Sequence, residues 1–161
     1  MFLTISGCSS LVQDSPDQSI EGADISGCAL ELSELDIDHP ALLYKEPLQS
    51  ITTVKRLRIS GGPELTLLPE EWLLHNYQAL EEIVVYDASH LQCLPQAMAS
   101  LTSLQSLQIS HANLIQALPD IPSSLSNLRM DNCHSELKKG YKKNVGPDWT
   151  KIADIRDVDI C

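Results

Sequence analysis

A pattern of apolar residues recurs five times between residues 32 and 130 of this 161-residue chain, and it restricts the possible folds more than any other feature. Each copy has apolar residues at its first, fourth and sixth positions, and successive copies start 22, 26, 24 and 21 residues apart. Because alternation with a period of two is typical of β-strands, each copy predicts one short strand with one apolar side. The copies are Leu32, Leu35 and Ile37; Val54, Leu57 and Ile59; Leu80, Ile83 and Val85; Leu104, Leu107 and Ile109; and Leu125, Leu128 and Met130.

Repeats of this length, each supplying one half-apolar strand, predict a solenoid. A single strand of this kind cannot bury its apolar side, but stacked copies pair into a parallel sheet above a continuous core. The spacing fits leucine-rich repeats better than ankyrin or tetratricopeptide repeats, whose periods are about 33 and 34 residues. We therefore predict an α/β solenoid: a leucine-rich-repeat horseshoe with a short-stranded parallel sheet on its concave face.

The segments between the strands carry a second apolar set that we expect on the convex side of the core. This set comprises Leu42, Leu43, Leu65, Leu68, Leu91, Leu94, Leu114, Leu118 and Leu137. A Leu-Pro pair recurs in three of these segments, and proline disfavours helix in the residue before it, so mostly irregular or 3-10 backbone is predicted. A short helix is expected only near 70–80, where Trp72, Leu73, Tyr77 and Leu80 follow Glu70 and Glu71 at helical spacing.

We divide the single predicted domain, 1–161, into three parts: a partial repeat with an acidic insertion (1–31), the repeats (32–137), and a C-terminal cap with a last strand (138–161). Leu3 and Ile5 fit the end of a repeat. Residues 20–30 also fit the template, but Leu32 starts a better copy 12 residues after Ile20. Whether 20–30 forms a strand is left open.

The C-terminal part repeats the strand pattern once more, at Ile155, Val158 and Ile160, 30 residues after the preceding copy. The longer connection contains Tyr141 and Trp149. We expect these two rings to pack over the final layer, because a solenoid needs a cap on its terminal apolar layer.

The formal net charge of −11 argues against nucleic-acid and anionic-membrane partners, which an acidic chain repels. Residues 1–50 hold nine acidic residues against one lysine. The exception is a basic run, Lys138, Lys139, Lys142 and Lys143, which could hold an acidic partner or could simply be a solvated cap surface.

An intracellular, cytoplasmic location is predicted from three absences in the sequence. No apolar stretch approaches the roughly 20 residues that span a bilayer. The first residues lack the basic region of a signal peptide. The five cysteines form no Cys-x-x-Cys pair and are odd in number, which argues against a disulfide framework. Cys8 and Cys133 occupy a repeat position that serves a structural role inside the turn.

No arrangement of residues supports chemistry, so we expect no enzyme, no cofactor and no metal site. The five histidines are scattered without the spacing of metal ligands. Cys133 and His134 are adjacent in sequence, but neighbouring residues point in different directions and make a poor nucleophile and base pair.

The outward positions of the strands form columns across the predicted sheet, because neighbouring strands lie about 4.8 Å apart. We predict that this concave face binds a protein, with Arg58, Tyr86 and Arg129 favoured because arginine and tyrosine are enriched in interface hot spots. The alternative is that Glu34, Arg56 and Glu82 only pair with one another in a solvated ladder. The candidate contact residues are Arg56, Arg58, Glu82, Val84, Tyr86, Gln108, Arg129 and Asp131.

Several stretches of the chain together are typical of one protein family. They are Glu136-Leu137-Lys138-Lys139, Gly146-Pro147-Asp148-Trp149 and Lys151-Ile152-Ala153 at the end of the chain, with Leu67-Leu68-Pro69-Glu70-Glu71-Trp72-Leu73 and Leu91-Gln92-Cys93-Leu94-Pro95 in the repeats. The chain resembles the C-terminal region of NB-ARC leucine-rich-repeat disease resistance proteins, above all the coiled-coil class of grasses. The resemblance implies a repeat domain that binds a pathogen effector or a host protein and restrains its own nucleotide-binding domain.

This chain departs from such receptors in lacking the Gly-x-x-x-x-Gly-Lys-Ser/Thr loop that cradles phosphates, so ATP binding by it is not expected. We predict a recognition module that contributes to defense. The alternative is a free-standing repeat adaptor, such as a substrate-selecting subunit. The sequence leaves open the ligand, the oligomeric state, and whether the chain is a fragment or autonomous.

Overall fold

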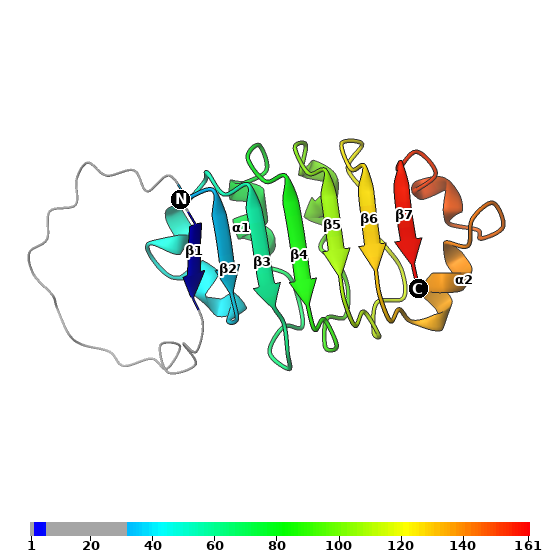
Figure 1. Ribbon diagram of the computed structural model, residues 1–161, viewed down its shortest axis with the longest axis horizontal. Helices are drawn as coiled ribbons and strands as arrows, with labels where there is room; N and C mark the ends of the chain where they lie inside the picture. The colour runs from blue at the N-terminus through cyan, green and yellow to red at the C-terminus, as the bar shows by residue number, and fades with distance from the viewer. Residues whose placement is uncertain (1, 6–31) are drawn as a thin grey trace, which may run out of the picture.

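Seven parallel strands form one continuous sheet in the order of the chain, from β1 to β7 (Figure 1). The computed structural model describes residues 2–5 and 32–161. The predicted insertion and the open question of residues 20–30 lie outside these ranges. The strands are β1 (Phe2–Ile5), β2 (Glu34–Ile37), β3 (Arg56–Ser60), β4 (Glu82–Tyr86), β5 (Ser106–Ile109), β6 (Asn127–Met130) and β7 (Asp157–Ile160).

The register of the sheet joins equivalent positions of successive repeats. Leu57 pairs with Leu35 on one side and with Ile83 on the other, and the same ladder continues to Leu107 and Leu128. All fifteen apolar residues of the five predicted copies are buried, which confirms the pattern and the solenoid-like stacking. β1 extends the ladder at the start and β7 at the end.

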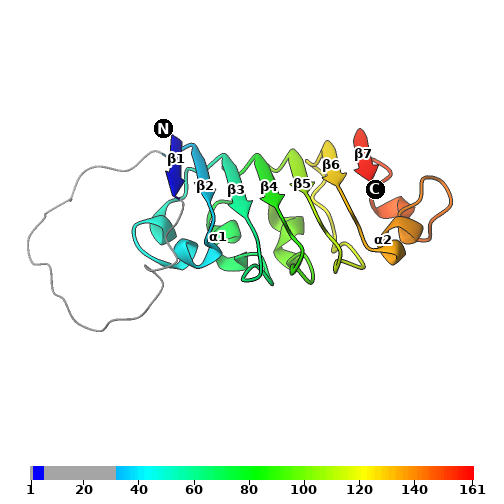
Figure 2. The same ribbon diagram turned by 60° about the horizontal axis from the view of Figure 1, so that its bottom comes forward.

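The helical segments of the described residues all lie on one side of the sheet, and none of them covers its other side (Figure 2). These segments are short because most connections complete only one turn before the next strand, as the Leu-Pro pairs predict. They are the 3-10 helices η2 (Pro40–Tyr44), η3 (Leu48–Ser50), η4 (Gln96–Ser100) and η5 (Trp149–Lys151), and the α-helices α1 (Glu70–His75) and α2 (Ser135–Gly140).

The predicted helix near 70–80 is present but shorter, since α1 ends at His75. The reason is Asn76, whose side chain is buried and bonded to the backbone of the preceding repeat. Its amide nitrogen donates to the Ile51 carbonyl at 2.9 Å, and its oxygen accepts from the Val54 N–H at 3.3 Å. Consecutive turns replace the helix beyond this point.

The prediction that Leu114 packs on the convex side of the core is wrong. Leu114 is 46% exposed, whereas its neighbour Ile115 is fully buried. Ile115 lies six residues after the last inward residue of its strand, as Leu65 and Leu91 do in theirs. The register counted from the strand therefore places Ile115 in the core and turns Leu114 outward. The other members of the set are buried.

Tyr141 and Trp149, the two rings expected over the final layer, both pack at the C-terminal end of the sheet. Tyr141 is buried, and its hydroxyl accepts from the Leu118 N–H at 3.1 Å, which ties the end of α2 to an earlier turn. Ile152 is fully buried beside it, and Trp149 is partly buried against the core.

Candidate functional site

Outward-facing strand residues form three columns on the side of the sheet that no helix covers, which we call the outer face. The first column contains Glu34, Arg56, Glu82, Ser106 and Asn127, and the second contains Asp36, Arg58, Val84, Gln108 and Arg129. In the third column, Ser60 pairs with Tyr86. Ser110 and Asp131 directly follow the last paired residues of β5 and β6. The backbone thus brings all eight predicted contact residues onto one face.

Arg56 is held by carboxylates on both neighbouring strands. Its guanidinium lies 2.9 Å from a Glu34 oxygen and 3.1 Å from a Glu82 oxygen. This is the ladder that the sequence offered as the alternative to partner binding. These two carboxylates already balance the charge of Arg56. We therefore expect Arg56 and Glu82 to stabilise the surface rather than to supply a free charge to a partner.

Arg58 and Arg129 are less tightly paired. The Arg58 guanidinium lies 3.8 Å from a Glu34 oxygen, and that of Arg129 lies 3.9 Å from an Asp159 oxygen. Contacts of this length between partly exposed groups contribute little to stability. Both guanidinium groups therefore keep most of their hydrogen-bond donors for another partner.

Val84, one of the predicted contact residues, occupies an outward position but contributes little surface to the outer face. It is only 7% exposed, although it lies apart from the apolar core cluster on the other side of the sheet. Longer side chains flank it on both sides in its column, Arg58 and Gln108. Such longer neighbours cover the short valine side chain, which therefore packs beneath them and is not accessible at the surface.

Tyr86 is the large aromatic side chain of the outer face, with 47% of its surface exposed. It lies at the C-terminal end of β4, where the strand enters its turn. Gln108 and Asp131 are partly exposed. A half-exposed tyrosine beside the column that holds Arg58 and Arg129 is the composition that protein interfaces favour.

The columns predicted from the sequence end at β6 and leave out two residues of β7. β7 adds Asp157 to the first column and Asp159 to the second. The signal was available, because the template at Ile155, Val158 and Ile160 fixes which residues of that strand point outward.

No group of three or more His, Cys, Asp or Glu side chains suited to a metal ion occurs among residues 2–5 and 32–161. Burial raises the pKa of the Cys133 thiol to about 11, so it is protonated at neutral pH. Within the same part of the chain, no helix has the length and apolar character that would let it cross a membrane.

No family model matches the chain, and no solved structure matches it. Two curated sequences from Arabidopsis thaliana, both called disease resistance protein RPS6, are each 31% identical to it over 139 residues. The matches cover 80% of this chain but only 12% of each relative's length. The similarity relates the chain to a plant disease resistance protein, in keeping with the broader part of the sequence resemblance. The grass origin and the coiled-coil class stay predictions.

Proposed function

We propose that the chain is a leucine-rich-repeat recognition module of an intracellular plant immune receptor, and that it binds a protein partner on its outer face. In this proposal the sheet is the concave side of a repeat horseshoe. The partner is a pathogen effector or a host protein. In a full receptor, the receptor's own nucleotide-binding domain is a further partner, and the module acts by binding rather than by catalysis.

The observation that carries the proposal is the outer face itself. One continuous sheet presents arginine, tyrosine and carboxylate side chains in register, and no helix of the described part of the chain covers them. Extended surfaces of stacked repeats are what solenoid proteins use for binding. The similarity to a disease resistance protein supports a role in defense.

A double substitution, Arg58→Ala with Tyr86→Ala, tests the proposal. The tagged wild-type chain and the double variant are used to capture proteins from plant tissue, with and without a pathogen. We expect at least one captured protein whose retention falls about tenfold in the variant, because loss of two hot-spot side chains has effects of this size. Calorimetry with that purified protein then measures the change in affinity.

Thermal unfolding of the double variant should match the wild type, because both side chains are partly exposed and only loosely paired. Tyr44→Ala with Lys139→Ala is the matched control, since it removes an exposed aromatic and an exposed cation from η2 and α2. Equal retention of every captured protein by the wild type and the Arg58/Tyr86 variant would refute the proposal.

A further inference from the structure

Among residues 2–5 and 32–161, β7 has a neighbouring strand on one side only, so its other edge carries backbone groups that no described strand pairs. The N–H groups of Asp157 and Cys161 point toward β6, where they donate to the Ser126 and Met130 carbonyls, both at 3.0 Å. In a parallel ladder alternate residues bond to opposite sides. The N–H and C=O groups of Val158 and Ile160 therefore point to the open edge.

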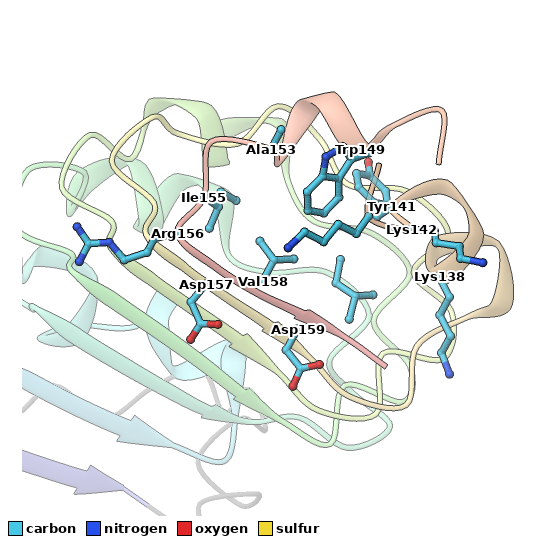
Figure 3. A pocket seen from close by; sticks show the side chains of 12 residues that line it. Lys138, Tyr141, Lys142, Trp149, Ala153, Ile155, Arg156, Asp157, Val158 and Asp159 are labelled. Atoms are coloured by element: carbon cyan, nitrogen blue, oxygen red, sulfur yellow. The ribbon is translucent and has the colours of Figure 1, made fainter. Parts of the chain in front are cut away.

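The apolar layer beneath this edge is incomplete. In β6 the two inward residues, Leu128 and Met130, are buried by the strand that follows. Their counterparts Val158 and Ile160 are only partly buried. Together with Trp149 and Ile155 they line a hollow of about 600 Å³ (Figure 3). The edge thus combines unpaired backbone groups with uncovered apolar surface.

The charges around this hollow are unbalanced. Lys138 and Lys142 lie beyond the C-terminal half of β7, and Arg156 lies at its start (Figure 3). None of the ion pairs within residues 2–5 and 32–161 involves these three residues.

Two acidic residues of β7, Asp157 and Asp159, also line the hollow and offset part of this positive charge. Asp157 accepts from the Asn127 amide at 3.4 Å, and Asp159 lies 3.9 Å from the Arg129 guanidinium. With Lys143, four basic residues line the hollow against two acidic ones, so its lining keeps a net positive charge, although the chain as a whole is acidic.

We infer that this edge binds an extended segment of a partner polypeptide, which adds a strand parallel to β7. Strand addition to an exposed sheet edge gains affinity from the backbone and specificity from alternate side chains. Two alternate apolar residues of the segment would cover Val158 and Ile160. Acidic residues after them would reach Lys138 and Lys142, so the partner is an apolar strand followed by an acidic run. This inference is independent of the outer face.

A second copy of the chain fits the edge less well. Two-fold pairing of β7 with its own copy would be antiparallel, because an isologous contact relates the two strands by a two-fold axis. Such pairing would bring the lysine end of one strand to Arg156 of the other. Like charges brought together in this way disfavour association.

The probe is a fluorescein-labelled peptide of about twelve residues, in which valine and isoleucine alternate with threonine and precede a run of glutamates. Fluorescence anisotropy with the full chain should give saturable binding. Lys138→Glu with Lys142→Glu should weaken it about tenfold or more, the effect of reversing two charges at a partly desolvated contact. A peptide with lysines in place of the glutamates should bind the reversed variant better than the wild type.

Lys139→Glu is the matched control, since Lys139 lies on the same helix but pairs with Glu136 at 2.8 Å and does not line the hollow. It should change affinity by no more than about twofold. Circular dichroism melting identifies any variant that fails to fold. Absence of binding at about 1 mM peptide, equal weakening by Lys139→Glu, or a concentration-dependent dimer that excludes the peptide would each overturn the inference.

Discussion

At the scale of single residues, one position in each turn shows how the repeat restricts side-chain size. Three residues past the last inward residue of each of four strands, β3 to β6, the chain has Gly62, Ala88, Ala112 and Cys133. The last three are buried, and the backbone one residue earlier adopts positive φ at Asp87, His111 and Asn132. The Cys133 thiol donates to the Met130 carbonyl at 3.1 Å, which is the structural role predicted for it.

The Cys133 thiol gives a pH-dependent prediction. Its pKa is about 11, raised chiefly by burial and further by nearby Cys161, whereas a thiol in an unfolded chain ionises near about 8.5. Between these values the unfolded state has lost a proton that the folded state retains, so a rise in pH favours unfolding. We expect the free energy of unfolding from urea titrations to fall between pH values of about 8.5 and 11 more steeply in the wild type than in Cys133→Ala. Identical slopes would contradict the buried, protonated thiol.

At the scale of elements, the strands could be predicted and the helix boundaries could not. The strands follow from short-range alternation, which each copy carries in six residues. The end of α1 is set instead by Asn76, whose partners Ile51 and Val54 belong to the previous repeat. Helical spacing continues to Leu80 in the sequence, so this tertiary contact overrides the local signal.

Asn76→Ala should destabilise the fold by about 3 kcal/mol, because it leaves the Val54 N–H and the Ile51 carbonyl without these bonds in a buried site. Chemical denaturation monitored by circular dichroism measures the loss. Asn113→Ala is the control, since it is the same substitution at an exposed position. A loss no larger than that of the control would show that Asn76 does not hold the two repeats together.

At the scale of the whole molecule, stacking assigns different tasks to the two sides of the sheet. Inward residues build the core, and outward residues are free to vary, so the repeat predicts where binding surface lies but not which residues are accessible. Arg56 is held by two carboxylates and Val84 is covered, and neither outcome follows from register alone. The binding edge of β7 was not predicted either. The sequence shows the lysine run at 138–143, but only the structure shows that the run lies beside the edge of β7.

Site-specific photo-crosslinking tests the recognition claim most directly. Benzoylphenylalanine replaces Tyr86 on the outer face in one variant and Tyr44 in η2 in another, and both are irradiated in plant tissue. Both side chains are about half exposed, so their access to solvent is matched. The outer-face account predicts a discrete covalent adduct with a second polypeptide from position 86 and none from position 44. An adduct from position 44 alone, or the same adducts from both positions, would contradict it.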